Sequence, residues 1–279
     1  MLLVKKLLRD IPAVLGLVII VTVVLVAIFA WHLVPDPYGV YDGDILTRLQ
    51  PPSWEHPFGT DDLGRDILSR VIVGSRGALM IALGVVAVSM VIGIPLGLYA
   101  GYESGWGSEA IMRLTDIFLA VPQLILALAV AQILSRGIES AMLALALTYW
   151  PFFTRTVFAE TRRVRTALFI EAMEGLGASR LRIITAHILP NVAASIIVRA
   201  TIGMGFTILT AATLGFLGIG ATPPSPDWGL TIAESREYLP ESWWFATFPG
   251  LAILLTVLGF NLFGDGLRDL VDPRLRRSR

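Results

Sequence analysis

Residues Glu171–Asn191 read EAMEGLGASRLRIITAHILPN, a polar segment that contains two glycines and two arginines. Long uncharged runs rich in Leu, Ile, Val and Ala lie on both sides of it. The stretch ALFIEAMEGLG predicts a helix that ends at Gly177, because glycine adopts a positive φ without a steric penalty. Ser179 is placed to cap a second short helix, LRIITAHI, which we expect to run up to Pro190.

The first of these predicted helices has an apolar face. Phe169, Ile170, Met173 and Leu176 fall at helical spacing, and so short a loop offers them no partner. Two interpretations remain open: an ordinary solvated loop with a surface hairpin, or a docking site for another protein. A helix pair that cannot bury its apolar stripe by itself favours the docking site.

The composition around this segment is that of an integral membrane protein. Of the 279 residues, 55% are hydrophobic and 16% charged, and the mean hydropathy is +0.71. Soluble domains usually carry about a quarter charged residues. The formal net charge is zero and so indicates no partner. The chain has no cysteine, which excludes disulfides and cysteine-ligated metals.

Six predominantly apolar runs approach or exceed the length of about 20 apolar residues that a helix needs to cross the hydrocarbon layer. They are Ile11–Trp31, Gly77–Tyr102, Ile117–Ser135, Ala141–Phe158, Asn191–Phe216 and Ser242–Gly264. Arg155 interrupts the fourth near its end, where an arginine can reach the headgroups, and Arg199 interrupts the fifth. The sequence therefore predicts an all-α integral membrane fold with about six transmembrane helices.

These spans divide the chain into four parts. The first run is too long for the apolar core of a usual signal peptide, so we expect it to be a retained anchor. The expected parts are a cytoplasmic N-terminus at 1–10, the first transmembrane helix at 11–33, an extracytoplasmic loop with an interfacial helix at 34–76, and a core of five transmembrane helices at 77–279 with a cytoplasmic loop at about 160–190 and a cytoplasmic tail.

The basic residues predict the orientation, because cytoplasmic segments carry an excess of Lys and Arg. With the N-terminus inside, the cytoplasmic segments hold Lys5, Lys6, Arg9, Arg113, Arg155, Arg162, Arg163, Arg165, Arg180, Arg182, Arg268, Arg274, Arg276, Arg277 and Arg279. The opposite side holds Arg48, Arg65, Arg70, Arg76, Arg136 and Arg236, diluted by many acids. Both termini are therefore expected in the cytoplasm.

The opening segment also resembles a known motif. Glu171, Ala172 and Met173, then Gly177, then Leu189–Pro190 are similar to the EAA motif of membrane subunits of binding-protein-dependent ABC importers. Met173 replaces the second alanine of that motif, and His187 replaces the usual isoleucine. HILPN is nonetheless similar to the dipeptide/oligopeptide/nickel branch. Three further stretches resemble the same branch in the same order: HPFGTDDLGRDILSRVIVGSR at 56–76, LGFLGIGATPPSPDWG at 214–229 and FNLFGDGLRDLVDPRLRR at 260–277.

The resemblance implies a type I ABC importer permease in a bacterial inner membrane. Such a subunit forms half of the translocation path with a second, related permease subunit as a heterodimer. Two ATPase subunits dock beneath, and an extracytoplasmic substrate-binding protein delivers the solute. The residues that the motif implies for ATPase coupling are Glu171, Ala172, Met173, Gly177, His187, Leu189 and Pro190, with Glu171 accepting a charge-assisted hydrogen bond. Dipeptides, oligopeptides, glutathione and nickel chelates all remain open as solutes.

No catalytic or metal site is expected in the chain. Its only lysines are Lys5 and Lys6, so it cannot contain a G-x-x-x-x-G-K-[ST] phosphate loop. ATP and magnesium would be bound by the ATPase subunits, and no nucleic acid is expected as a partner. The three histidines lie in separate segments. The acids Asp61, Asp62 and Asp66 do not follow the spacing of a calcium loop.

An ion-gradient-driven carrier or channel is the alternative function. It would need ionisable groups within the spans, and the middles of the first, second, fourth and sixth contain none. Asp116 is expected to pair with nearby Arg113 at the interface. Arg199 lies about 13 Å beyond Pro190 along a helix and is expected to face a translocation path or to contact a partner subunit. Because the predicted spans contain no acidic relay for protons, the residues favour the ABC permease over the carrier or channel.

Overall fold

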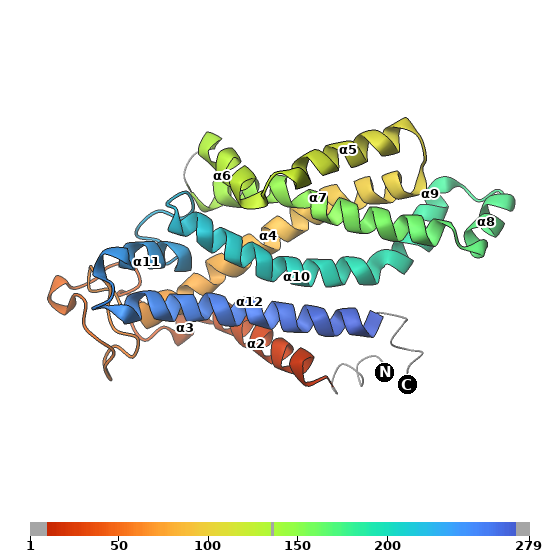
Figure 1. The fold of residues 1–279 in the computed structure, drawn as a ribbon. Coiled ribbons are helices and arrows are strands. Elements are labelled where there is room, and N and C mark those ends of the chain that lie inside the picture. Colours follow the sequence, from red (N-terminus) through yellow and green to blue (C-terminus); the bar gives the residue numbers. More distant parts are fainter. Residues whose placement is uncertain (1–9, 135–136, 272–279) are drawn as a thin grey trace.

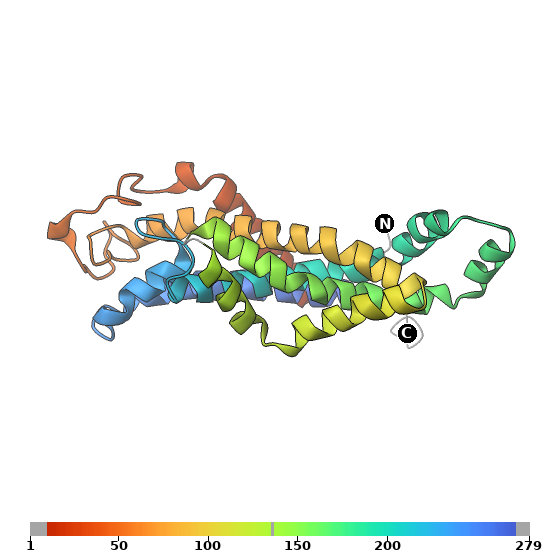
Figure 2. The same cartoon turned by 90° about the horizontal axis from the view of Figure 1, so that it is seen from above.

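The computed structural model describes residues 10–134 and 137–271, which form an elongated bundle of helices (Figures 1 and 2). Within these ranges there is no β-strand, only an isolated bridge between Thr60 and Asp66. The helices are α2 (Ile11–Ile28), α3 (Ala30–Leu33), α4 (Ile67–Tyr102), α5 (Trp106–Ala120), α6 (Gln123–Ile133), α7 (Ile138–Arg165), α8 (Leu168–Gly175), α9 (Arg180–Arg182), α10 (Leu189–Phe216), α11 (Trp228–Glu234) and α12 (Trp243–Val271), with 3-10 turns at Ile45–Thr47 and Ser235–Tyr238 and a π-helical segment at Ile183–Ile188.

The predicted spans correspond to helices of this bundle. Those that begin at Ile11, Gly77, Asn191 and Ser242 overlap α2, α4, α10 and α12, each long and apolar enough to cross a membrane. The fourth, Ala141–Phe158, falls within α7, a helix of 28 residues that is more polar and packs along α4. Of the basic residues used to predict orientation, Lys5, Lys6, Arg9, Arg136, Arg274, Arg276, Arg277 and Arg279 lie outside the described residues.

The third predicted span differs from the sequence expectation. Instead of one run over Ile117–Ser135, the chain forms α5 and α6, whose axes are bent by 92° at the break. The break is Val121–Pro122, and Val121 has an extended backbone (φ −91°, ψ 132°). A residue before proline is disfavoured in the α conformation, which accounts for the break. Two ion pairs also differ from expectation: Asp116 pairs with Arg155, and Arg113 pairs with Glu109 at 2.5 Å.

The expected interfacial helix is a second correction. The ILSRVIV stretch is not a separate helix but forms the first turns of α4. Asp66 caps this helix, because its Oδ2 accepts a hydrogen bond from Ser69 N at 2.7 Å. Arg70 is buried and donates to the carbonyl oxygens of Val40 at 2.9 Å and Pro224 at 3.2 Å. These acceptors are remote in sequence, so the local amphipathic pattern did not reveal them.

A row of glycines allows α4 and α7 to pack closely. Gly93, Gly97 and Gly101 recur every four residues and so share one face of α4. A Cβ on Gly97 would lie 2.7 Å from the Cβ of Val157 and 2.8 Å from the carbonyl oxygen of Thr154. Small residues at this spacing let two membrane helices approach until their backbones touch. The α4–α7 pair is therefore the central contact of the bundle.

A second group of helices, α2, α10 and α12, completes the bundle, and α10 packs against both α4 and α7. Gly16 of α2 and Gly259 of α12 bring α2 and α12 into the same kind of close contact. Figure 1 shows α2 beginning and α12 ending toward the end of the bundle where α8 and α9 lie. The described ends of the chain therefore point the same way as the segment 160–190, which is the relative arrangement that an even number of spans requires.

A buried cluster of ion pairs lies at the end of the bundle opposite α8 and α9. Arg65 lies between Asp61, whose Oδ2 is 2.5 Å from its Nε, and Glu234, whose Oε2 is 3.0 Å from its Nη2. Arg70 approaches the same two acids at 3.6 Å. Trp244 adds a hydrogen bond from its indole Nε1 to Thr60 O at 3.2 Å. The cluster fixes the loop before α4 to α11, because each buried charge requires its partner.

Three acids of this cluster lie close enough to one another to share a cation. Oxygens of Asp61, Asp62 and Glu234 lie within 4.8 Å of one another. The Arg65 guanidinium contacts all three carboxylates and so supplies the positive charge of the group. Burial raises the pKa of the Asp62 and Glu234 carboxyls, and the arginine partly opposes that rise. We assign this group a structural role.

The paired tryptophans at the start of α12 differ from each other. The sequence predicts both as part of an interfacial aromatic belt. Trp243 is half exposed, as that role requires, whereas Trp244 is buried under the loop before α4. Trp244 is therefore a packing residue that fixes this loop.

Candidate functional site

The segment Glu171–Asn191 projects beyond the other helices at one end of the bundle (Figures 1 and 2). After α7 ends at Arg165, the chain forms α8, turns through Leu176–Ser179, and re-enters the bundle through α9. The turn is fixed by two backbone hydrogen bonds, from Gly177 N to Glu174 O at 3.0 Å and from Ala178 N to Met173 O at 3.1 Å. This pair of bonds is a Schellman motif, and Gly177 has the φ of +79° that it requires.

The second predicted helix of the segment differs from expectation. It does not end at Pro190 as a separate short helix but continues into α10, giving one apolar helix over Arg180–Phe216. A π-helical turn at Ile183–Ile188 makes this possible, and it closes with a bond from Leu189 N to Ile184 O. Proline lacks an N–H and its ring crowds the preceding turn, so a locally widened helix accommodates Pro190. Ser179 occupies the N-cap position without a side-chain capping bond.

The apolar face predicted for the first helix is divided between the core and the surface. Ile170 is 1% exposed, and Met173 packs against the same core cluster, so for these two the expectation of an unpartnered face was wrong. Phe169 and Leu176 are exposed, and Leu168 joins them at 82% exposure. We call Leu168, Phe169 and Leu176 the α8 apolar surface. Nothing in the described part of the chain covers it.

The motif residues fall on two elements. Glu171 and Ala172 are exposed on α8 beside this surface, and Gly177 forms the turn. His187 belongs to the π-helical turn, and Leu189 and Pro190 begin α10. His187 and Leu189 are half-buried there, whereas Glu171 forms no side-chain hydrogen bond or ion pair with any other described residue. The free carboxylate is therefore on α8.

Sequence reasoning missed the contacts that tie this segment to α4. The Tyr102 hydroxyl, at the end of α4, donates to Glu174 Oε1 at 2.7 Å. One residue further, Glu103 pairs with Arg180 at 2.8 Å. The Arg165 guanidinium lies 5.1 Å from the centre of the Tyr102 ring. These groups line a polar cavity of about 310 Å³. The partners are 72 and 77 residues apart, so no local pattern indicated them.

Arg199 lies on α10, about 15 Å along the helix from Leu189. Its guanidinium carbon is 4.9 Å from the centre of the Phe152 ring and 5.5 Å from that of Tyr149, both on α7. Its Nε is buried without a hydrogen-bond partner, and no described acid forms an ion pair with it. Aromatic faces attract the cation without neutralising it.

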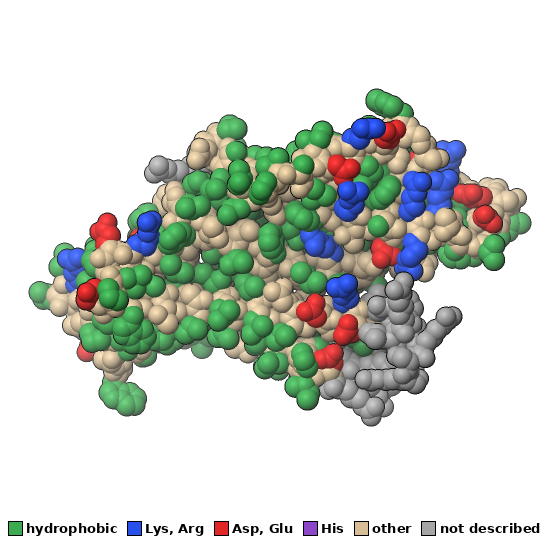
Figure 3. Space-filling view, viewed as in Figure 1, with side chains coloured by type: hydrophobic (Ala, Val, Ile, Leu, Met, Phe, Trp, Pro, Cys, Tyr) green, Lys and Arg blue, Asp and Glu red, His purple; other side chains and the backbone are tan. Residues whose placement is uncertain are grey.

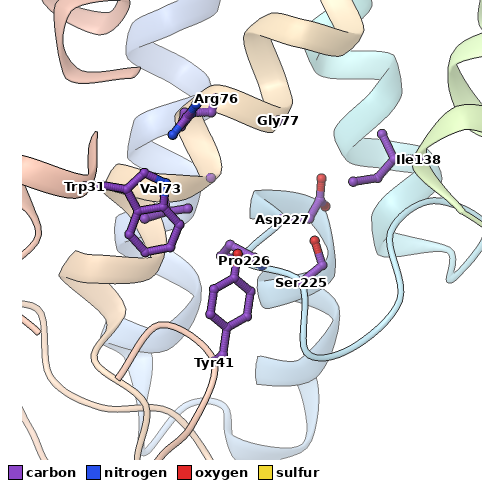
Figure 4. Close-up of a pocket in the computed structure, with 10 residues that line it drawn as sticks. Trp31, Tyr41, Val73, Arg76, Gly77, Ile138, Ser225, Pro226 and Asp227 are labelled. Carbon is purple, nitrogen blue, oxygen red and sulfur yellow. The ribbon is translucent and has the colours of Figure 1, made fainter. Parts of the chain in front are cut away.

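A second cavity of about 310 Å³ opens at the other end of the molecule (Figure 4). Trp31 and Tyr41, whose rings stack 6.2 Å apart, lie on one side of it, with Arg76 above them in the view. Asp227 also lines the cavity, but its Oδ1 caps α11 by accepting from Leu230 N at 2.9 Å. Its carboxylate is already used to hold α11, and Arg76 is exposed, so this cavity shows no prepared ligand site.

Comparison with known families gives two matches. A family model described as binding-protein-dependent transport system inner membrane component matches residues 93–277. A second, described as the N-terminal transmembrane domain of oligopeptide transport permease C, matches residues 2–52. Together they span both ends of the bundle and the segment Glu171–Asn191.

Similar proteins include three permeases with different named substrates. The probable D,D-dipeptide transport system permease protein DdpC of Escherichia coli K12 is 45% identical over 92% of this chain and 86% of its own length. The dipeptide transport system permease protein DppC of Alkalihalophilus pseudofirmus is 44% identical over 98% and 89%. The glutathione transport system permease protein GsiD of Pectobacterium atrosepticum is 41% identical over 98% and 90%.

The fold is also similar to that of a solved transporter. A chain of the MetNI methionine ABC transporter, in an inward-facing conformation, superposes with a TM-score of 0.62 at 20% identity. The match covers 73% of this chain and 97% of the other. A second crystal form gives a TM-score of 0.60 at 22% identity.

Proposed function

The chain belongs to the family of binding-protein-dependent transport system inner membrane components, and we propose that it forms half of the translocation path for peptides in an ATP-driven importer. As an ABC importer permease it works with ATPase and substrate-binding partners. The peptide class is supported by the relatives, whose names refer to dipeptides, D,D-dipeptides and glutathione.

The observation that carries the coupling role is the free surface of α8. Three exposed apolar side chains lie beside a carboxylate that has no partner in the described part of the chain, on the element that projects farthest from the bundle. An apolar patch with one charge at its side fits a groove that carries a basic residue. We assign this groove to the ATPase subunit, with Glu171 as the acceptor of a charge-assisted hydrogen bond.

The contacts behind α8 supply a route from the ATPase to the spans. Movement of α8 would reach α4 through the Tyr102–Glu174 hydrogen bond and the Glu103–Arg180 ion pair. It would reach α10 through the unbroken helix that follows Gly177. Rigid elements joined by specific contacts are what an energetic coupling between two sites requires.

The remaining parts of the assembly are inferred from the family. We propose a related but different permease subunit as the other half of the path, two ATPase subunits beneath, and an extracytoplasmic binding protein. ATP and magnesium belong to the ATPase subunits, because a chain whose only lysines are Lys5 and Lys6 has no phosphate loop. The location is the bacterial inner membrane, with both termini and the segment 160–190 in the cytoplasm.

Reconstitution of the whole complex with the Glu171→Ala variant tests this function. Loss of a hydrogen bond to a charged group costs about 1.5–3 kcal/mol. We therefore expect ATPase association about ten- to a hundredfold weaker, with loss of peptide uptake and normal membrane insertion. ATPase association, ATP hydrolysis and uptake are measured on the same proteoliposomes.

The matched control is Arg163→Gln on α7. Arg163 forms an exposed ion pair with Glu160 at 2.6 Å, and such a pair contributes little. This variant should bind the ATPase and transport like the unmodified chain. The coupling role is wrong if Glu171→Ala also transports and hydrolyses ATP at the unmodified rate.

A further inference from the structure

One face of the bundle carries charged side chains among apolar ones. On the face drawn in Figure 3, basic and acidic groups lie over α5, α7 and α10, amid hydrophobic side chains. Arg155 of α7 and Asp116 of α5 neutralise each other, and each is about half exposed. Arg199 of α10 lies over the rings of Phe152 and Tyr149 and has no ion-pair partner among the described residues. Arg199 is therefore a guanidinium without a counter-ion in the described part of the chain.

The periodicity of α10 shows that this face is not covered by the chain itself. Phe206 follows Arg199 by two helical turns, so both lie on the same side of the helix. Phe206 is 40% exposed, and its ring stacks on Tyr149 with the centres 6.0 Å apart. An unpaired arginine about 15 Å along a membrane-spanning helix from Leu189 is costly to expose to lipid. The face must therefore meet either water or another protein.

We propose that Arg199 binds the carboxylate of the transported peptide, within an aqueous path along this face of α5, α7 and α10. This inference rests on the proposed peptide importer. Arginine stays protonated at every physiological pH, and a peptide α-carboxyl is ionised at neutral pH. The rings of Phe152 and Tyr149 fix the guanidinium without occupying its charge, so a passing carboxylate can accept hydrogen bonds from its terminal nitrogens.

The chemistry shared by the named substrates favours a substrate carboxylate over an acid of the partner permease. Asp116 of the neighbouring helix α5 is paired with Arg155, so it does not serve as the counter-ion of Arg199. Dipeptides, D,D-dipeptides and glutathione also differ in side chains and stereochemistry but share a free carboxylate. A single guanidinium between aromatic walls recognises that shared group and tolerates the differences.

The test compares a peptide with its amide. The whole complex with its binding protein is placed in proteoliposomes, and uptake of alanyl-alanine and of its C-terminal amide is measured. The affinity of the free binding protein for both probes is measured separately, so that its own preference can be divided out. The remaining preference for the acid is compared between the unmodified chain and the variants Arg199→Gln, Arg199→Lys and Arg155→Gln.

We expect the unmodified chain to prefer the acid and Arg199→Gln to lower that preference about tenfold or more, as loss of a charge-assisted hydrogen bond predicts. Arg199→Lys should retain part of the preference, and Arg155→Gln should leave it unchanged. Equal loss of uptake for both probes in Arg199→Gln would show a structural or inter-subunit role and overturn the inference. Failure of the unmodified complex to take up the dipeptide would instead overturn the proposed function itself.

A second measurement applies if Arg199→Gln does not assemble. The chain has no cysteine, so Phe206→Cys introduces a single thiol on the same face. A charged methanethiosulfonate reagent should modify this thiol in the assembled complex, and alanyl-alanine should slow the reaction more than its amide. Absence of reaction from both sides of the membrane would show that no aqueous path runs along this face.

Discussion

Gly177 shows how the course of the chain after α8 depends on one backbone angle. A Cβ at this position would have no atom within 4 Å, so the space around the turn is open. What the position demands is its φ of +79°, which L-residues other than Asn and Asp rarely adopt. Added bulk therefore has no steric role here, contrary to a simple view of a crowded turn. The direction in which the chain leaves α8 through the Schellman motif therefore depends on the backbone conformation of Gly177.

Two substitutions at Gly177 separate conformation from size. Positive φ costs an ordinary L-residue about 1–2 kcal/mol, and a β-branched one more. We expect Gly177→Val to displace α8, to lower ATPase association and uptake severalfold, and to leave insertion of the spans intact. Gly177→Asn adds comparable bulk but tolerates this angle, so it should retain most of the activity. If the two variants lose activity equally, side-chain size decides at this turn.

At the scale of elements, the contact between α4 and α7 depends on Gly93, Gly97 and Gly101. The stretch GIPLGLYAG displays this spacing in the sequence, so a search for small residues at every fourth position would have paired α4 with some other helix. It would not have identified α7 as that helix. The contact explains why the least apolar predicted span is in fact central: α7 meets protein on several sides and needs less lipid-facing surface.

A pair of substitutions on the same helix measures this contact. Gly97→Val places atoms within 2.7 Å of Val157, and overpacking of this kind costs about 1–3 kcal/mol. We expect a lower midpoint of thermal unfolding in detergent and poorer assembly of the complex. Gly77→Ala is the control, because no atom lies within 4 Å of its added methyl group. It should be neutral or slightly stabilising, since alanine favours the helix. Equal midpoints for the two variants would mean that α4 and α7 do not pack through this row.

At the scale of the whole molecule, hydropathy predicted most of the architecture, because a membrane span must be apolar over a length set by the bilayer. It failed where another physical constraint decided the outcome. Pro122 divides the third span, a local signal that was present but outweighed by the apolar run. Arg70 enters the helix of the second span because Val40 and Pro224 accept its hydrogen bonds. The hydrogen bond between Tyr102 and Glu174 joins segments that are far apart in the sequence, so no local pattern predicted it.

The orientation of the whole chain can be tested because it has no cysteine of its own. Ser179 lies in the turn after α8, and Thr222 lies in the loop between α10 and α11; both are exposed, so a thiol at either position would be accessible. The positive-inside rule places Ser179 in the cytoplasm and Thr222 outside, at opposite ends of α10. An impermeant maleimide applied to intact cells should therefore label the Thr222→Cys chain and spare the Ser179→Cys chain until the membrane is opened. The reverse pattern would place α8 on the side of the binding protein, where it could not meet an ATPase, and would remove the basis of the coupling role. Labelling of both positions from outside would mean that α10 does not cross the membrane.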